Sequence, residues 1–202
     1  MTREIDFYFD FSSPYGYIAS VRIDHLASKF GRTVRWRPFL IGAVYKAIGG
    51  PSIPEQPAKF DYIRRDLPRS AAYYGVPFSF APTFPEALLA PARAVWWLND
   101  RDPAVAGAFA RAAYHAYWAE GRRIGEPGVT ADIAAGLGVD RDELLAALGD
   151  QAVKDRLRRE TDDAIARGVF GSPYIVIDGE PFWGSDRLVQ IEAWLESGGW
   201  PK

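Results

Sequence analysis

Apolar residues alternate with period two only near the two ends of the chain, and this limits the possible folds more than any other feature. Near the start, Ile5, Phe7, Phe9 and Phe11 alternate with polar or tyrosyl residues, which predicts a strand with one buried face. From about residue 42 to 168, apolar residues instead recur every three or four positions, which predicts helices. Strand patterns return only after this block.

The first forty residues predict a strand, a helix and a second strand. Pro14 suits the first turn of a helix, and the apolar spacing continues the helix over Tyr17–Phe30 until Gly31 ends it. A second alternating strand follows at Thr33–Phe39. Because a helix joins the two strands, we expect them to be parallel.

The last 35 residues predict a hairpin and a helix. The runs Tyr174–Ile177 and Pro181–Trp183 flank an Asp-Gly pair at 178–179, a strong signal for a tight hairpin turn. A final helix is predicted over Ser185–Leu195, capped by the side chain of one of its first two residues.

The order of elements is therefore βαβ, a block of five or six helices, and ββα. This order predicts an α/β fold with a large all-helical insertion. Residues 1–40 and 168–202 form one discontinuous domain in this prediction, and residues 41–167 form the inserted helical domain.

The composition excludes several classes of function. The net charge of −2 offers no basic excess for nucleic acid or an anionic membrane, and no run of about 18 apolar residues predicts a membrane span. Cysteine is absent and only His25 and His115 are present, so no metal site is predicted, and His115 is interpreted as lining the helical core. Without a signal segment at the start, the predicted location is the cytoplasm.

The stretch DFYFDFSSPYGYIA at residues 6–19 places two hydroxyls where the first strand meets a helix. Ser12 and Ser13 compete for the role of N-cap. Ser13 can also donate a hydrogen bond to an anion at the helix N-terminus. A serine-hydrolase interpretation is disfavoured, because the Gly-x-Ser-x-Gly pattern is missing and His25 lies about three turns along the helix.

Four segments together resemble the 2-hydroxychromene-2-carboxylate isomerases and the related kappa-class glutathione transferases. They are FYFDFSSPYGYIA near the start, PAKFDYIRRDL at 57–67, AYWAEGRRI at 116–124 and GVFGSPYIVIDGEPFWGSDRL at 168–188. The resemblance implies a thioredoxin-like fold of the disulfide-oxidoreductase type. Redox enzymes of that fold carry Cys-x-x-Cys where this chain has Ser13-Pro14-Tyr15-Gly16.

The resemblance also implies a glutathione site. Ser13 would activate the sulfur, and a cis bond before Pro173 would expose the backbone of Ser172 to the cysteinyl unit. Gly184, Ser185 and Asp186 would hold the γ-glutamyl end, and Lys59 would hold the glycyl carboxylate. Without a ligand, the side chains at 185 and 186 are ordinary helix caps and Lys59 is a surface charge. Gly50 stands where the family usually has asparagine.

The function implied by the resemblance is glutathione-dependent cis–trans isomerisation of 2-hydroxychromene-2-carboxylate-type aromatic substrates, in aromatic hydrocarbon catabolism, by a homodimer. The thiolate would add to an activated double bond, which then rotates before the thiolate leaves. We expect the substrate between the two domains, with its carboxylate near basic residues that the sequence does not single out. Two alternatives stay open: a kappa-like transferase that conjugates electrophiles, and a non-catalytic glutathione- or peptide-binding module.

Overall fold

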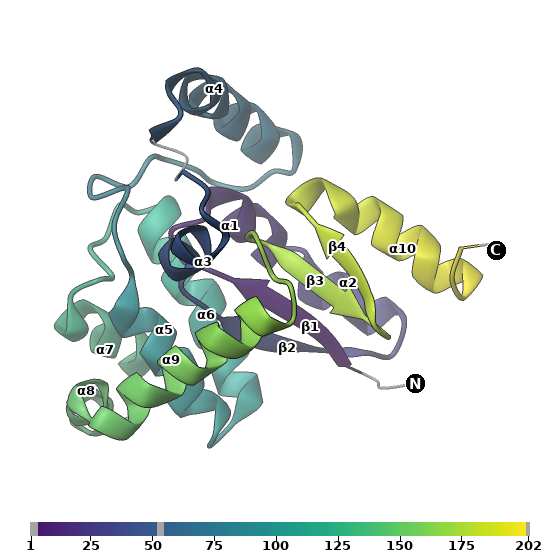
Figure 1. Cartoon of the computed structure of the whole chain (residues 1–202). Helices are drawn as coiled ribbons and strands as arrows, with labels where there is room; N and C mark the ends of the chain where they lie inside the picture. The colour runs from purple at the N-terminus through teal and green to yellow at the C-terminus, as the bar shows by residue number, and fades with distance from the viewer. Residues whose placement is uncertain (1–3, 52–54, 201–202) are drawn as a thin grey trace.

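The strands of the structure lie near the two ends of the chain, as predicted. The structure is a computed structural model that describes residues 4–51 and 55–200, so residues 1–3 and 201–202 of the predicted discontinuous domain lie outside the described residues. One sheet has the order β2-β1-β3-β4, with β1 parallel to β2 and antiparallel to β3 (Figure 1). Its strands are β1 (Glu4–Phe9), β2 (Thr33–Pro38), β3 (Tyr174–Ile177) and β4 (Glu180–Trp183).

The predicted alternation in β1 accounts for its place in the centre of the sheet. Ile5, Phe7 and Phe9 point to one face and are fully buried in the main core cluster. Phe7 is paired with Trp36 on one side and with Ile175 on the other. Burial of each of these phenylalanines contributes about 1.5–3 kcal/mol, so the strand is fixed by its apolar face.

The predicted hairpin turn is confirmed. Asp178 and Gly179 both have positive φ, 51° and 90°, as a type I′ turn requires, and they join β3 to β4. Arg32, the residue before β2, donates two hydrogen bonds to the carboxylate of Asp178, at 3.0 and 2.6 Å. The hairpin turn is thereby joined to the strand on the opposite side of β1.

The single helix predicted after β1 is wrong, because the structure has two short helices there. These are α1 (Pro14–Ser20) and α2 (Ile23–Lys29). The break is a tightened turn in which the N–H of Arg22 donates to the carbonyl of Ala19 at 3.0 Å. The guanidinium of Arg22 then stacks on Tyr74, 4.1 Å from the ring centre. This contact lies more than fifty residues away in sequence, so a local pattern does not reveal it.

The described part of the chain between β2 and β3 contains no strand, and its α-helices number seven rather than the predicted five or six. Aspartates at positions 102, 140 and 150 cap three of them by accepting backbone N–H groups at their first turns. The seven helices are α3 (Ile41–Ile48), α4 (Pro57–Tyr73), α5 (Leu89–Asn99), α6 (Pro103–Trp118), α7 (Pro127–Ala135), α8 (Arg141–Gly149) and α9 (Gln151–Ala166).

The last predicted helix is present, but its predicted cap is wrong. A short 3₁₀ turn, η2 (Ser185–Arg187), precedes α10 (Leu188–Ser197). Neither Ser185 nor Asp186 accepts a hydrogen bond from a backbone N–H as a helix cap. Gly184 precedes the turn with a φ of 115°, a conformation that an L side chain rarely adopts.

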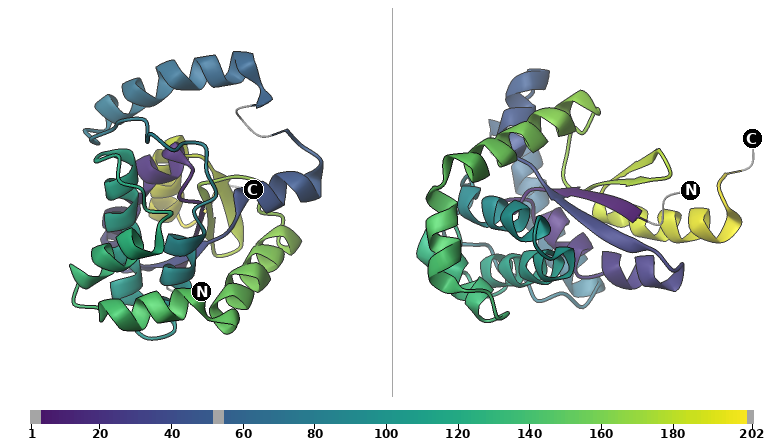
Figure 2. Two further views of the ribbon diagram at one scale, coloured as in Figure 1. Left: turned by 90° about the vertical axis from the view of Figure 1, so that its left-hand side faces the viewer. Right: turned by 90° about the horizontal axis from the view of Figure 1, so that it is seen from below.

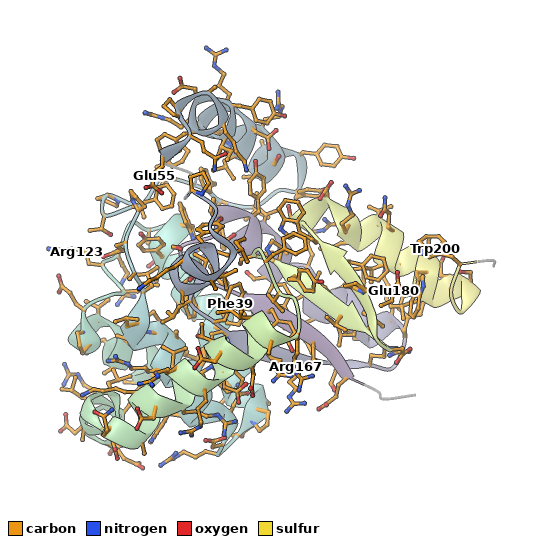
Figure 3. The ribbon with its side chains drawn as sticks, viewed as in Figure 1. Phe39, Glu55, Arg123, Arg167, Glu180 and Trp200 are labelled. Carbon is orange, nitrogen blue, oxygen red and sulfur yellow. The ribbon has the colours of Figure 1, made fainter. Side chains whose placement is uncertain are left out.

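The sheet is covered on both faces (Figure 2). Helices α1, α2, α6 and α10 pack against the Phe7 face, and α3 and α9 cover the opposite face. On that opposite face, Tyr8 belongs to a second core cluster together with Phe39, which Figure 3 labels. The main core cluster contains residues of the sheet and of the helical block alike, including Tyr114 of α6. Among the described helices, none is long and apolar enough to span a membrane.

Candidate functional site

Ser13 caps α1 and also contacts the turn before β3. Its Oγ accepts a hydrogen bond from the N–H of Gly16 at 3.1 Å and donates one to the carbonyl of Ser172 at 2.8 Å. Pro14 follows as the first helical residue, so its missing N–H costs nothing. The side chain is half-buried and lies between the helix and residues 172–173, as the sequence predicts.

Ser12 points elsewhere. Its Oγ and its N–H both donate to Oδ1 of Asp10, at 2.7 and 2.8 Å. Of the two adjacent hydroxyls, Ser13 therefore caps the helix, while Ser12 holds a buried carboxylate. The two side chains have different roles because they point in different directions after the end of β1.

Asp10 is a residue of this site that the sequence analysis missed. Its side chain is buried, and its Oδ2 accepts the N–H of Ile41, at the start of α3, at 2.8 Å. Its backbone N–H donates to Oγ of Ser172 at 2.9 Å, and its carbonyl accepts the N–H of Ser13 at 2.9 Å. Burial raises the pKa of Asp10, although the bonds from Ile41 and Ser12 act in the opposite direction.

The turn before β3 has the geometry that the resemblance implies. The Ser172–Pro173 peptide bond is cis. The carbonyl of Ser172 accepts the hydroxyl of Ser13, whereas its N–H has no acceptor among the described residues. The carbonyl of Pro173 accepts the N–H of Gly184 at 3.1 Å, so this turn is joined directly to the start of η2.

The predicted γ-glutamyl residues follow that contact. Ser185 is buried, Asp186 is exposed, and η2 packs against α1. A carboxylate oxygen of Asp186 lies 3.3 Å from the guanidinium of Arg187 on the adjacent position. The structure thus brings Ser185 and Asp186 to the same side of the sheet as Ser13, and their role toward a ligand stays a prediction.

Two aromatic residues of α6 form hydrogen bonds with the segment between β1 and α1, and the sequence analysis did not assign them to the site. The hydroxyl of Tyr114 donates to the carbonyl of Asp10 at 2.8 Å, and Nε1 of Trp118 donates to the carbonyl of Phe11 at 2.9 Å. A Cβ at Gly16 would collide with the Tyr114 hydroxyl, so only glycine fits there. Burial raises the pKa of Tyr114 well above its ordinary value, which keeps it a donor.

Lys59 lies apart from these residues, exposed near the start of α4. Helix α4 packs against α1, where the hydroxyl of Tyr15 donates to Asp66 at 2.7 Å. Burial and this bond raise the pKa of Tyr15. Gly50 follows Gly49, whose φ of 72° ends α3. The structure therefore places Lys59 on the helix beside α1 without bringing it into contact with the other candidates.

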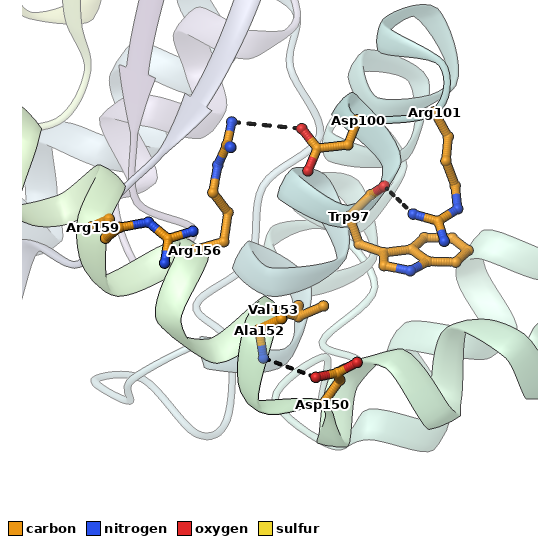
Figure 4. Close-up of a pocket in the computed structure, with 8 residues that line it drawn as sticks. All are labelled: Trp97, Asp100, Arg101, Asp150, Ala152, Val153, Arg156 and Arg159. Carbon is orange, nitrogen blue, oxygen red and sulfur yellow. Dashed lines mark hydrogen bonds and ion pairs between the residues drawn. The ribbon is translucent and has the colours of Figure 1, made fainter.

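Two hollows of about 320 Å³ each are lined by neither Ser13 nor residues 172–173 and 184–186. The first lies between α5 and α9 (Figure 4), and its charges are largely compensated. Arg101 stacks on Trp97, 3.6 Å from the ring centre, and Arg156 lies 3.5 Å from Asp100. We assign no ligand to this hollow, because its position and pairing do not connect it to Ser13.

The interpretation of His115 as a core-lining residue is wrong. Its ring is about half exposed, with Nε2 3.5 Å from Glu120 and Nδ1 3.4 Å from the hydroxyl of Tyr17. It lies on the outer side of α6, since Tyr114 and Trp118 occupy the inner side. No group of three potential metal ligands occurs within residues 4–51 and 55–200.

The fold and the site define a thioredoxin-like protein whose first helix begins at Ser13-Pro14 without a cysteine. Accordingly, the model of the DSBA-like thioredoxin domain family matches residues 4–196. The chain belongs to the 2-hydroxychromene-2-carboxylate isomerase family. A 2-hydroxychromene-2-carboxylate isomerase from Sphingobium xenophagum is 36% identical over 200 residues, covering 96% of this chain and 99% of that protein.

Two further comparisons agree with this assignment. A solved structure of a 2-hydroxychromene-2-carboxylate isomerase superposes with a TM-score of 0.88 at 33% identity, covering 96% of this chain and 95% of that one. Glutathione S-transferase kappa 2 from Caenorhabditis elegans is 31% identical and covers 96% of this chain and 92% of its own length. The predicted family and the predicted thioredoxin-like fold are confirmed.

Proposed function

We propose that this protein is a glutathione-dependent isomerase of 2-hydroxychromene-2-carboxylate-type aromatic substrates. The observation that carries the proposal is the position of the Ser13 hydroxyl, which lies between the first turn of α1 and the peptide group before Pro173. The isomerases at 32–36% identity supply the reaction class. We expect glutathione as the cofactor because the similar kappa proteins are named glutathione S-transferases.

The residues at the site fit glutathione. The N–H of Ser172 has no acceptor in the described part of the chain, so it is available to a peptide carbonyl alongside the turn. Asp186 is exposed and can take an ammonium group beside its pairing with Arg187, and Lys59 is exposed and available to a carboxylate. These residues would hold the cysteinyl, γ-glutamyl and glycyl parts of the tripeptide, respectively.

Glutathione, when bound, would supply the thiolate that adds reversibly to the conjugated double bond of the substrate. The protein's part in this chemistry is to favour the ionised sulfur. In the structure, the hydroxyl of Ser13 donates its proton to the carbonyl of Ser172, while the N–H of Gly16 donates to Oγ of Ser13. A rotation about the Cβ–Oγ bond of Ser13 redirects this proton outward and leaves the bond from Gly16 in place.

A kappa-like transferase is the second candidate, favoured by the 31% identity to glutathione S-transferase kappa 2. The two functions differ in whether the product retains glutathione. Mass spectrometry of the products, with catalytic and with stoichiometric glutathione, separates them. An isomerase yields many turnovers per glutathione and no conjugate, whereas a transferase consumes one glutathione per product.

The Ser13→Ala variant tests the proposal. Removing the hydroxyl takes one donor from the sulfur, so we expect the pKa of bound glutathione to rise by about one to two units. The thiolate absorbance in the ultraviolet, followed against pH, measures this change, and glutathione-dependent turnover at neutral pH should fall with it. If the titration of bound glutathione is unchanged, Ser13 is a helix cap only and the proposal loses its main residue.

Ser12→Ala is the matched control, because it removes a neighbouring hydroxyl that faces Asp10 instead. We expect the pKa of bound glutathione to stay at its wild-type value in this variant. Both variants must first be shown to fold, since Ser13→Ala also loses an N-cap that contributes about 1 kcal/mol. Circular dichroism melting curves provide that check.

The proposal includes two expectations that rest on the sequence and the family resemblance. We propose that the protein acts in the cytoplasm and that it forms a homodimer. Fractionation of cells and analytical ultracentrifugation would test these two points. A monomer at micromolar concentration would remove the homodimer from the proposal without affecting the chemistry at Ser13.

A further inference from the structure

Arg93, in α5, differs from the other arginines with a buried unsatisfied nitrogen. Its Nε is buried without a hydrogen-bond partner, as are single nitrogens of Arg22, Arg37 and Arg156. Arg37 and Arg156 nevertheless form ion pairs with carboxylates, and Arg22 stacks on Tyr74. The guanidinium of Arg93 has no ion pair, hydrogen bond or aromatic contact with any residue in the described ranges. A half-buried cation without a counter-charge is costly unless something else compensates it.

The guanidinium lines the second hollow, which we call the Arg93 cleft. It lies between α3, α5 and α9, and its volume of about 320 Å³ is in the lower range of small-molecule pockets. The walls include apolar side chains and a second half-buried cation, Lys154, which forms no ion pair with a described residue. The lining residues that matter here are Leu40, Ala43, Leu89, Arg93, Lys154 and Leu157.

Two acids also line the cleft, and they do not neutralise Arg93. Asp155 accepts a hydrogen bond from the side-chain amide of Gln151 at 3.0 Å, and Asp162 is exposed. Neither carboxylate forms an ion pair with the guanidinium of Arg93. Burial lowers the pKa of Arg93, which agrees with a guanidinium that lacks a facing carboxylate.

The cleft lies at the same edge of the sheet as Ser13. β1 and β2 are parallel, so their carboxyl ends meet at one edge, where ligands of α/β folds commonly bind. β1 leads to Ser13, and β2 leads through Phe39 to Leu40 in the wall of the cleft. The next residue, Ile41, donates its N–H to Asp10, whose carbonyl accepts the N–H of Ser13.

We propose that the Arg93 cleft binds the carboxylate of the aromatic substrate, with Arg93 as the residue that pairs with it and the apolar walls against the ring. This inference rests on the proposed function for the identity of the substrate. A guanidinium fits a carboxylate because it can offer two parallel N–H donors. Lys154 adds positive potential from α9.

Binding of salicylate tests the inference without glutathione or turnover, since salicylate combines an aromatic ring, a hydroxyl and a carboxylate. In calorimetry we expect Arg93→Met to weaken salicylate binding about tenfold or more, because a charge-assisted bond is lost. Arg93→Lys, which keeps the charge, should lose less and provides a second variant. Arg159→Met, on α9 at the other hollow, is the matched control and should bind as the wild type does.

Two further ligands identify what the cleft recognises. Salicyl alcohol, which lacks the carboxylate, should bind Arg93→Met and wild type equally. Inorganic phosphate at the same concentration should not displace salicylate, and displacement would overturn the assignment to an aromatic carboxylate. Equal salicylate affinity in Arg93→Met and wild type would overturn the inference as a whole.

Kinetics with the aromatic substrate then link the cleft to the reaction. We expect Arg93→Met to raise KM for the aromatic substrate about tenfold while KM for glutathione stays unchanged. If wild type shows no glutathione-dependent turnover, the proposed function fails while the salicylate result still stands. If wild type turns over and Arg93→Met has the same KM for the aromatic substrate, only the inference about Arg93 fails.

Discussion

Asp10 forms a hydrogen bond at every one of its polar atoms, and these bonds join four separate parts of the chain. Its carboxylate holds Ser12 and the start of α3, while its backbone holds Ser13, Ser172 and Tyr114. Charged side chains are seldom this buried without an ion pair. The physical role of Asp10 is therefore to position the end of β1 relative to the turn at Pro173.

Replacement of Asp10 by asparagine should be costly despite the similar shape. Both carboxylate oxygens face donors, so an amide must turn its NH₂ group toward an N–H or hydroxyl that also donates. We expect the free energy of unfolding to fall by about 1–3 kcal/mol, as measured by urea denaturation. Asp102→Asn, at the exposed cap of α6, should change it little, because asparagine is an equally good cap. Equal stability of both variants would contradict the positioning role.

The sequence allowed Ser13 to be predicted and Asp10 not, for a physical reason. Ser13 stands between a strand pattern and a proline that begins a helix, which is a local signal. Strand alternation over residues 5–11 instead placed Asp10 on the polar side of the strand. The structure ends β1 at Phe9, so Asp10 leaves the alternation and turns inward. The distant hydrogen-bond partners of Asp10 are residues 41, 114 and 172, and no local sequence pattern connects them.

Among the elements, the sheet could be predicted because its strands are short, apolar and bounded by turn residues. The helices were predicted in kind, but their number and breaks depend on contacts between distant parts of the chain. The break between α1 and α2 accompanies the stacking of Arg22 on Tyr74, and α4 is placed by the bond from Tyr15 to Asp66. Patterns within a single helix carry no record of either partner.

The ion pair between β2 and the β3–β4 turn makes a prediction about acid stability. The hydrogen bonds from Arg32 lower the pKa of Asp178. The folded state therefore binds fewer protons at this carboxyl than the unfolded chain does. Its contribution to stability is complete above the unfolded pKa of about 3.9 and is lost as the pH falls through the lower folded value.

The Asp178→Asn variant should therefore be less stable than wild type at neutral pH, and the difference should shrink below about pH 4. Asparagine is suitable here because it tolerates the positive φ of this position. Urea denaturation at several pH values measures both points. Asp142→Asn, at an exposed carboxylate of α8, controls for the loss of one surface charge. A difference that stays constant down to about pH 3 would contradict the role of the ion pair.

At the scale of the whole molecule, the predicted order of βαβ, helices and ββα is confirmed, and so is the family. The sequence could predict this because the order depends only on where the hydrophobic period changes. The sequence could not predict that one core cluster would contain residues of both the sheet and the helical block. In this cluster, Phe9 of β1 packs against Tyr114 of α6, with 5.5 Å between the ring centres. The predicted division into two domains remains a prediction.

Binding of glutathione should stabilise the whole molecule, because only the folded chain presents residues 13, 172 and 186 together. At a concentration 100 times the Kd, the gain is about 2.7 kcal/mol, which thermal denaturation detects. We expect Asp186→Ala to weaken glutathione binding about tenfold to a hundredfold, since the ligand's ammonium group loses its partner. Asp163→Ala, at an exposed carboxylate in α9, is the control. Unchanged glutathione affinity in Asp186→Ala would remove Asp186 from the site.

The contact between Gly16 and Tyr114 limits which substitutions the chain can accept during evolution. One residue belongs to the segment that carries Ser13, and the other belongs to the inserted helices, yet the hydroxyl of Tyr114 occupies the space of a side chain at 16. A larger residue at 16 is admissible only together with a smaller one at 114, and the carbonyl of Asp10 then loses a donor. The inserted helices are thus not an interchangeable module. A chimera built from two relatives must inherit both positions from the same parent.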